Sequence, residues 1–279
     1  MGYHHPGRRG LIRPIASFPP TVIFPQFKGL PFRKSLPQRG AQKEFVITNR
    51  SNRWMVRPLI SLILLGGALG AFLGLTGAVL GGATTAFDER ILLSMRTPGD
   101  LSDPIGGQQI EELSRDFTAL GGTGVLTALS VSIVGYLLII GKRRLALIVV
   151  LAVGSGILLS LGLKQGFDRP RPELVPHGSN VYTSSFPSGH SMMAAICYLT
   201  LGGLLCSIQN GRRAKVYILS MAILNTLAVG ISRVHLGVHW PTDVLAGWLA
   251  GGIWALAVWL LIRWWQARPA AIAEGSEIP

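Results

Sequence analysis

Two residues near the C-terminal end of the chain have the types and spacing of a nucleophile and its partner. His239 and Asp243 are four residues apart, so a helix that begins here would place both side chains on one face. A carboxylate bonded to one imidazole nitrogen fixes the tautomer and leaves the other nitrogen free to attack phosphorus. The alternative is that Asp243 only caps a helix and His239 lies at a membrane interface. Arg233 would add a phosphate ligand. His235 could line the same pocket, but a solvent-facing loop position is the expected one.

A second segment, Ser185-Phe186-Pro187-Ser188-Gly189-His190, leads directly into a long apolar run. Proline at a helix start, glycine that allows close backbone approach, and free N–H groups at a helix N-terminus together are typical of an anion site. Ser188 can add a hydroxyl donor, and His190 can exchange a proton with a leaving oxygen at the edge of that site. An ordinary helix cap is the alternative interpretation.

A third segment follows another apolar run and carries Lys164, Arg169 and Arg171. These cations could simply reach toward lipid headgroups. Positive charge on the outer side of a membrane opposes the usual bias of loop charges, however, so an anion ligand is the better explanation. Arginine offers a planar fork for phosphate oxygens and lysine a compact charge. Asp168 and Arg169 are assigned no catalytic role.

The elements that must position these segments are membrane-spanning helices. The chain has 279 residues, of which 49% are hydrophobic and only 14% charged, and its mean hydropathy is +0.43. These values are typical of a membrane protein. We therefore expect an all-α, polytopic membrane bundle of about six transmembrane helices, each near the length that crosses a bilayer. The predicted spans are 59–83, 119–140, 145–163, 190–208, 216–231 and 241–262.

The distribution of charge predicts the orientation of the bundle. The net charge is +13, but 11 of the 26 Lys and Arg residues precede Pro58 and most others flank apolar runs, which argues against nucleic-acid binding. We expect residues 1–57 to be a basic, disordered cytoplasmic tail, 58–265 the membrane domain and 266–279 a short cytoplasmic tail. The protein would then lie in the plasma (inner) membrane with both termini in the cytoplasm. The three polar segments would lie on the periplasmic or extracellular side.

Two further features concern packing. Gly66, Gly70 and Gly74 recur every fourth residue in the first span, which predicts close contact with another helix. The segments 88–95 and 109–117 mix charged and apolar residues at helical spacing, which predicts short interfacial helices that cover the outer end of the bundle.

The three polar segments together resemble the signature motifs of the type 2 phosphatidic acid phosphatase and vanadium haloperoxidase superfamily. Those motifs are K-x6-R-P, P-S-G-H and S-R-x5-H-x3-D, and every specified position is present here in the right order. The similarity covers roughly residues 59–262. The matching residues are Lys164, Arg171 and Pro172, then Pro187 to His190, then Ser232, Arg233, His239 and Asp243.

The resemblance implies a role for each matching residue. His239 would be the nucleophile, His190 the general acid and Asp243 the partner of His239. It also implies an enzyme that needs no metal or other cofactor. The phosphate-binding residues would be Lys164, Arg171, Ser188, Gly189 and Arg233.

The expected function is hydrolysis of a lipid phosphate or diphosphate through a phosphohistidine. All three segments lie at the predicted outer boundary of the membrane, where a lipid phosphate arrives with its tail already in the bilayer. Undecaprenyl diphosphate, phosphatidylglycerophosphate and phosphatidate all remain open as substrates. The alternatives are a vanadate-dependent haloperoxidase-like enzyme, and a non-catalytic lipid-binding or transport protein.

Overall fold

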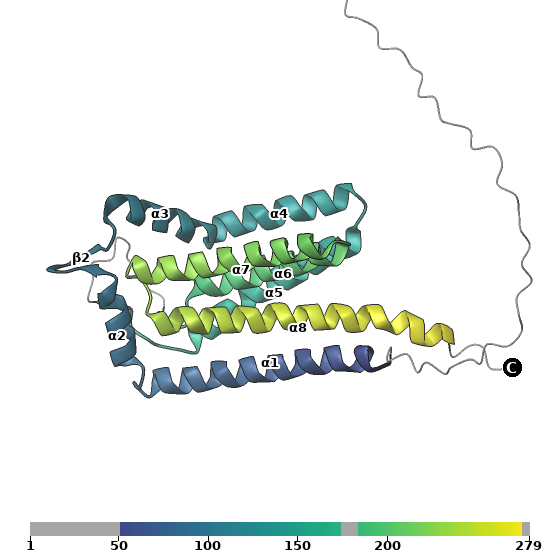
Figure 1. Cartoon of the computed structure of the whole chain (residues 1–279), viewed down its shortest axis with the longest axis horizontal. Helices are drawn as coiled ribbons and strands as arrows, with labels where there is room; N and C mark the ends of the chain where they lie inside the picture. Colours follow the sequence, from purple (N-terminus) through teal and green to yellow (C-terminus); the bar gives the residue numbers. More distant parts are fainter. Residues whose placement is uncertain (1–50, 174–183, 275–279) are drawn as a thin grey trace, which may run out of the picture. The chain divides into compact units, whose positions relative to one another are not determined.

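The long helices of this computed structural model run side by side (Figure 1). The structure describes residues 51–173 and 184–274. Within these ranges five helices are long and apolar enough to cross a membrane, and a bent pair makes a sixth candidate. The expected bundle of about six spans is therefore confirmed. The five are α1 (Ser51–Leu80), α5 (Arg143–Gln165), α6 (Gly189–Ile208), α7 (Arg212–His235) and α8 (Pro241–Glu274). The bent pair is α3 (Gly107–Leu120) followed by α4 (Thr123–Ile139).

The boundaries of the predicted tails fall inside helices or outside the described residues. Helix α1 already begins at Ser51, and α8 continues to Glu274. The rest of the predicted tails, residues 1–50 and 275–279, lies outside the described ranges.

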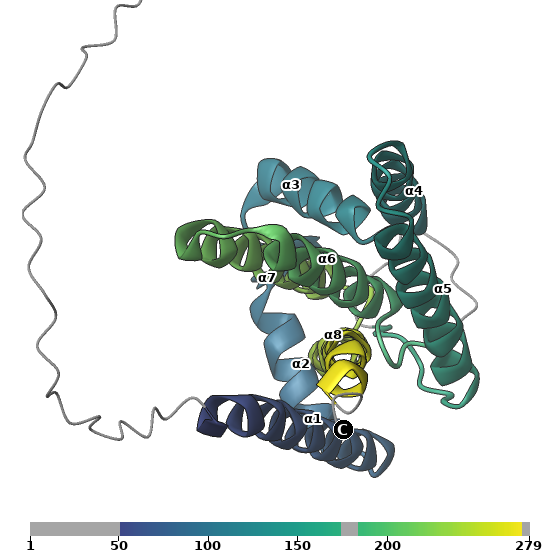
Figure 2. The ribbon, with the colours of Figure 1, turned by 90° about the vertical axis from the view of Figure 1, so that its right-hand side faces the viewer.

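Helix α6 is the centre of the bundle. It packs most extensively against α8 and α7, and Figure 2, seen nearly along the helices, shows it enclosed by these helices and α5. Small residues make the α6–α8 contact close: a Cβ atom placed on Gly247 would lie 2.8 Å from the carbonyl oxygen of Ser188, and one on Gly251 would lie 2.6 Å from that of Met192. This approach of two backbones brings the start of α6 against the start of α8.

The glycine repeat predicted to pack does not do so against any described residue of this chain. A Cβ atom on Gly66, Gly70 or Gly74 would meet nothing within 4 Å in the described part of the structure. Helix α1 instead contacts α8 through larger residues, Phe72 and Val79, which belong to the core cluster around Phe186. The prediction from the repeat was wrong because spacing alone does not show which face of a helix has a neighbour.

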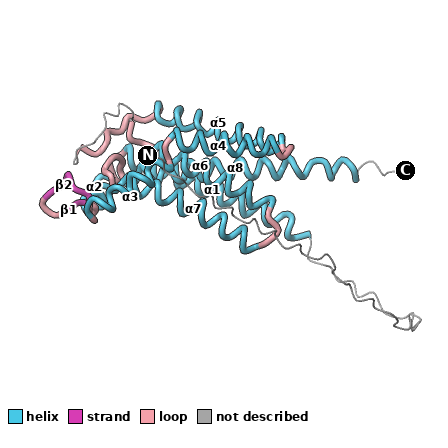
Figure 3. Tube along the Cα trace, turned by 90° about the horizontal axis from the view of Figure 1, so that it is seen from above, coloured by secondary structure: helices cyan, strands magenta, loops and turns pink. Residues whose placement is uncertain are grey.

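Short elements gather at one end of the spans (Figure 3). They are α2 (Thr85–Ser94), α3 (Gly107–Leu120) and a small antiparallel hairpin of β1 (Arg96–Thr97) and β2 (Asp100–Pro104). The two short helices predicted from the sequence are present, their interfacial position remains a prediction, and the hairpin between them was not predicted. The axes of α3 and α4 differ by 49°, so the amphipathic α3 leaves the direction of the spans. The polar segments singled out from the sequence lie at this same end, between α5 and α6 and between α7 and α8.

Candidate active site

The proposed nucleophile and its partner are buried together at the start of α8. The His239 side chain is 2% exposed and the Asp243 side chain 0%, and Nδ1 of the imidazole lies 3.5 Å from Oδ2 of the carboxylate. The Ser185 hydroxyl lies beside both groups, 2.5 Å from Oδ2 of Asp243 and 3.3 Å from Nδ1 of His239. Asp243 also accepts a hydrogen bond from the backbone N–H of Trp240 at 3.0 Å. The carboxylate therefore both caps α8 and faces the imidazole, so the two interpretations of Asp243 are not exclusive.

The neighbour of the other ring nitrogen identifies the tautomer. Nη1 of Arg171 lies 3.2 Å from Nε2 of His239 and also donates to the carbonyl of Val238 at 2.8 Å. A guanidinium has only donors, so Nε2 must carry the lone pair and Nδ1 the proton. Nδ1–H then points to the Ser185 and Asp243 oxygens. This is the tautomer that an attack through Nε2 requires.

Burial keeps this imidazole neutral. Desolvation lowers the pKa of His239 to about 4, an effect that the hydrogen bond and the negative charge of Asp243 oppose and that Arg233 and Arg171 reinforce. At neutral pH the ring therefore holds a lone pair. A neutral imidazole is the nucleophilic form of histidine.

Three cationic side chains from different elements converge on His190, and the two arginines also act on His239. Lys164 at the end of α5, Arg171 in the following loop and Arg233 near the end of α7 all interact electrostatically with His190. Lys164 also interacts with both arginines. Burial lowers the pKa of Arg171, and the Asp243 carboxylate opposes that shift. Like charges held this close repel one another, so the cluster favours binding of an anion.

One polar atom of this cluster is left without a partner. Nε of Arg233 is buried and has no hydrogen-bond acceptor in the described residues. A buried donor without an acceptor costs free energy, and a bound phosphate oxygen would remove that cost. The unsatisfied donor therefore supports the assignment of Arg233 to the anion site.

The Pro187–His190 segment meets Lys164 directly. A Cβ atom on Gly189 would lie 3.0 Å from Cε and 3.2 Å from Nζ of Lys164, so the glycine leaves room for the ammonium group. Ser188 precedes the first residue of α6, but its hydroxyl makes no capping bond and instead accepts one from Ser191 Oγ at 2.9 Å. Ser188 therefore occupies the N-cap position of α6, but its hydroxyl does not cap the helix. The predicted site residues of all three segments lie together.

Sequence reasoning missed three residues that contact this site. Ser185 bonds Asp243, and Arg169, for which the sequence indicates no catalytic role, donates to Oδ1 of Asp243 at 2.5 Å. Nη2 of Arg169 also donates to Asp88 of α2 at 2.7 Å. An unexplained cation two residues from Arg171 was the available signal for Arg169. Asp88 gave none, because its partners are far away in the sequence.

The prediction for His235 was wrong as well. His235 ends α7 and is only 7% exposed. Its Nδ1 lies 2.9 Å from the hydroxyl of Ser114 and its Nε2 lies 3.0 Å from the carbonyl oxygen of Ile105. Arg96 donates to the His235 carbonyl at 2.6 Å. The histidine thus ties α7 to α3 and the hairpin rather than facing solvent.

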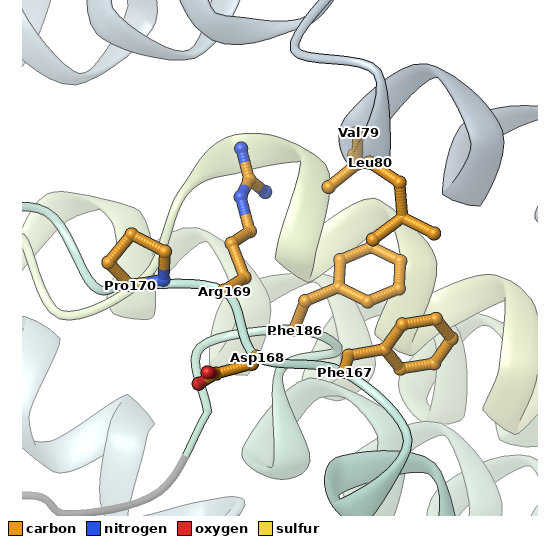
Figure 4. A pocket seen from close by; sticks show the side chains of 7 residues that line it. All are labelled: Val79, Leu80, Phe167, Asp168, Arg169, Pro170 and Phe186. Atoms are coloured by element: carbon orange, nitrogen blue, oxygen red, sulfur yellow. The ribbon is translucent and has the colours of Figure 1, made fainter.

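A cavity of about 190 Å³ lies next to Arg169 but outside the cationic cluster. Figure 4 shows it between the end of α1 and the loop after α5, with Arg169 and Asp168 leaving that loop in opposite directions. Its walls are largely apolar and do not include His190 or His239. They are Val79, Leu80, Phe167, Asp168, Arg169, Pro170 and Phe186.

Comparison with known proteins places this arrangement in a family. The model of the PAP2 superfamily matches residues 145–267. Phosphatidylglycerophosphatase B of Bacillus subtilis is 37% identical over 147 residues, 51% of this chain and 70% of that protein. Undecaprenyl-diphosphatase of Sulfolobus acidocaldarius is 40% identical over 67 residues, but these are only 24% of this chain and 28% of that protein.

A solved structure agrees with the sequence matches. The crystal structure of a transmembrane PAP2 type phosphatidylglycerolphosphate phosphatase from Bacillus subtilis superposes with a TM-score of 0.61 and 29% identity, covering 75% of this chain and 97% of that one. The family model, the motif residues and the shared helical architecture lead to one conclusion: this integral membrane chain belongs to the PAP2 superfamily.

Proposed function

We propose that this chain is a lipid phosphatase that cleaves a phosphate ester or diphosphate through phospho-His239, without a metal ion. The observation that carries the proposal is the geometry of His239. Its ring is buried and neutral, Nδ1 faces the Ser185 and Asp243 oxygens, and Nε2 faces the cationic cluster. A nucleophile is thereby presented to the place where an anion is expected to bind.

The proposed reaction has two displacements at phosphorus. In the first, Nε2 of His239 attacks in line, a P–N bond forms and the P–O bond to the leaving group breaks, while His190 gives that oxygen a proton. In the second, His190 takes a proton from water, whose oxygen attacks phosphorus and breaks the P–N bond. Inorganic phosphate leaves and both histidines return to their starting states.

The cations stabilise charge in both displacements. Lys164, Arg171 and Arg233 would bind the nonbridging oxygens, together with the Ser188 hydroxyl and the N–H groups at Gly189. Because these donors are fixed before the substrate arrives, little reorganisation is needed as charge develops. Asp243 accepts the Nδ1 proton in a hydrogen bond and stabilises the positive ring of the phosphohistidine.

The position of the site favours a substrate held in the bilayer. His190 and His239 lie at the ends of spanning helices, where a lipid phosphate would present its headgroup. The names of the relatives include a phosphatidylglycerophosphatase and an undecaprenyl-diphosphatase. We infer that the substrate belongs to this class, with the site on the periplasmic or extracellular face and both termini in the cytoplasm, as the positive-inside bias predicts.

The test is phosphate release by purified protein from a panel of lipid mono- and diphosphates in detergent with EDTA present. We expect turnover of at least one lipid, its loss in His239→Ala, and a labelled phosphoenzyme that is stable in alkali and lost in acid. Full activity of a folded His239→Ala protein would contradict the nucleophile assignment. Strict dependence on a divalent metal would contradict the mechanism, and halide oxidation with vanadate would favour the haloperoxidase alternative.

A further inference from the structure

Arg169 connects the proposed nucleophile's partner to an element outside the three motifs. Its Nη1 donates to Oδ1 of Asp243 at 2.5 Å and to the Thr242 hydroxyl at 2.8 Å. Its Nη2 donates to Oδ2 of Asp88 at 2.7 Å. The Arg169 side chain is 13% exposed and both carboxylates are essentially buried. One guanidinium thus bridges two buried carboxylates from different helices.

Asp88 bonds not only Arg169 but also the start of α8. Its Oδ1 accepts from the backbone N–H of Thr242 at 2.9 Å, and its Oδ2 accepts from the Thr242 hydroxyl at 2.7 Å. Asp88 belongs to α2, the short helix at the end of the spans, and is 0% exposed. The interfacial helix is therefore bonded to the same turn of α8 that carries Asp243.

These bonds leave Asp243 little freedom. Arg169 occupies one of its oxygens, while Ser185 and the backbone N–H of Trp240 occupy the other. The indole of Trp240 lies against the arginine, with 5.7 Å between the guanidinium carbon and the ring centroid. A carboxylate bonded on both oxygens cannot rotate without breaking a charge-assisted bond. Its position relative to Nδ1 of His239 depends on Arg169.

We propose that Arg169 and Asp88 are positioning residues for the proposed reaction, and that α2 thereby orients the His239–Asp243 pair. Arg169 acts on Asp243, and Asp88 acts on Asp243 through Arg169. Without the guanidinium, Asp243 would lose a bond on Oδ1 and turn away from the imidazole. The inference rests on the proposed role of His239.

The pair also has a plain structural explanation, because Asp88 caps α8 and a buried ion pair that loses one partner destabilises a protein. The two explanations differ in what they affect. A merely structural pair would change the amount of folded protein and its unfolding temperature. A positioning pair also lowers kcat of the protein that remains folded. The losses in kcat from Asp88→Asn and Arg169→Gln would then not multiply in the double variant.

The experiment compares kcat and KM of folded protein, purified in detergent, for three single variants and one double variant. The single variants are Arg169→Gln, Arg169→Lys and Asp88→Asn, and the double variant combines Asp88→Asn with Arg169→Gln. Arg115→Gln is the matched control, since it removes an ion pair to Glu111 at the same end of the molecule, where the Arg115 side chain is 64% exposed. Wild type and His239→Ala are measured in the same assay. Formation of labelled phosphoenzyme is followed separately from phosphate release.

We expect Arg169→Gln to lower kcat about 10- to 100-fold, the size of effect that loss of one charge-assisted hydrogen bond produces, with KM changed less than about threefold. Arg169→Lys should recover part of kcat. The double variant should be no slower than Arg169→Gln alone. Arg115→Gln should match wild type.

Wild-type kcat in folded Arg169→Gln, or effects of Asp88→Asn and Arg169→Gln that multiply, would overturn the inference. If Arg169→Gln does not fold, Arg169→Lys decides the question, because a kcat equal to wild type in that variant would also overturn it. Failure of the proposed function is a different result: wild type would then be inactive on every lipid, or His239→Ala would be as active as wild type.

Discussion

Gly189→Ala tests whether the Pro187–His190 segment and Lys164 form one phosphate site. The added methyl group would lie 3.0 Å from Cε and 3.2 Å from Nζ of Lys164. Carbon atoms in favourable contact are about 3.5–4.0 Å apart, so the end of the lysine must move by about 0.5–1 Å. The lysine side chain is flexible and can make this shift, so the protein should fold while its ammonium group leaves the position that the glycine allows.

The expected magnitude follows from that displacement. A shift of about 1 Å in a group that binds the reacting phosphoryl can cost about 100-fold in rate, so we expect kcat/KM to fall by about 10- to 100-fold. The assay is phosphate release from the preferred lipid. Gly162→Ala is the control, because it lies in α5 close to Lys164 in sequence, and its added methyl group would meet nothing within 4 Å in the described residues.

A double variant sharpens the test. If Gly189→Ala acts through Lys164, it should cause little further loss in a Lys164→Met background, since the displaced group is already absent. Activity of Gly189→Ala equal to that of Gly162→Ala would refute the proposed role of the segment. A full additional loss in the Lys164→Met background would show that the methyl group acts on something other than the lysine.

Other predictions concern the residues around His239. Ser185→Ala should lower kcat about 10- to 100-fold, because a hydrogen bond to the Asp243 carboxylate is worth about 1.5–3 kcal/mol, and unchanged kcat would contradict this. The folded-state pKa of His239, about 4, lies below the ordinary 6.5, so the unfolded chain binds more protons between these values and stability should fall as the pH drops from 6.5 to 4. The unfolding temperature of wild type should decline more over that range than that of His239→Gln. His235→Ala should cost about 1–3 kcal/mol by breaking bonds to Ser114 and the hairpin, seen as a lower unfolding temperature with kcat nearly unchanged.

Features that depend on neighbouring residues could be predicted from the sequence. The spans follow from the length and apolarity of each run, and α2 and α3 follow from mixed charge at helical spacing. His239 and Asp243 are four residues apart, the histidine just before the start of α8 and the aspartate in its first turn, so their meeting needs only local structure. The other motif residues stand at the ends of predicted spans. Because helices of this length must cross the bilayer, those ends were expected on one side.

Contacts between distant segments could not be predicted in this way. Arg169 is 81 residues from Asp88 and 74 from Asp243, and nothing in the local pattern of any of these residues indicates the others. The burial of His235 depends on where α3 lies, because Ser114 and Ile105 enclose it from another part of the chain.

The glycines show the same division between local pattern and tertiary contact. Gly66 and its repeat have the spacing of a packing face but meet no neighbour in the described part of this chain, whereas Gly247 and Gly251 bring α8 against α6. Chemical type and periodicity are properties of a segment and can be read from the sequence. Which side chain meets which depends on how the helices cross and rotate, and only the packed structure determines that.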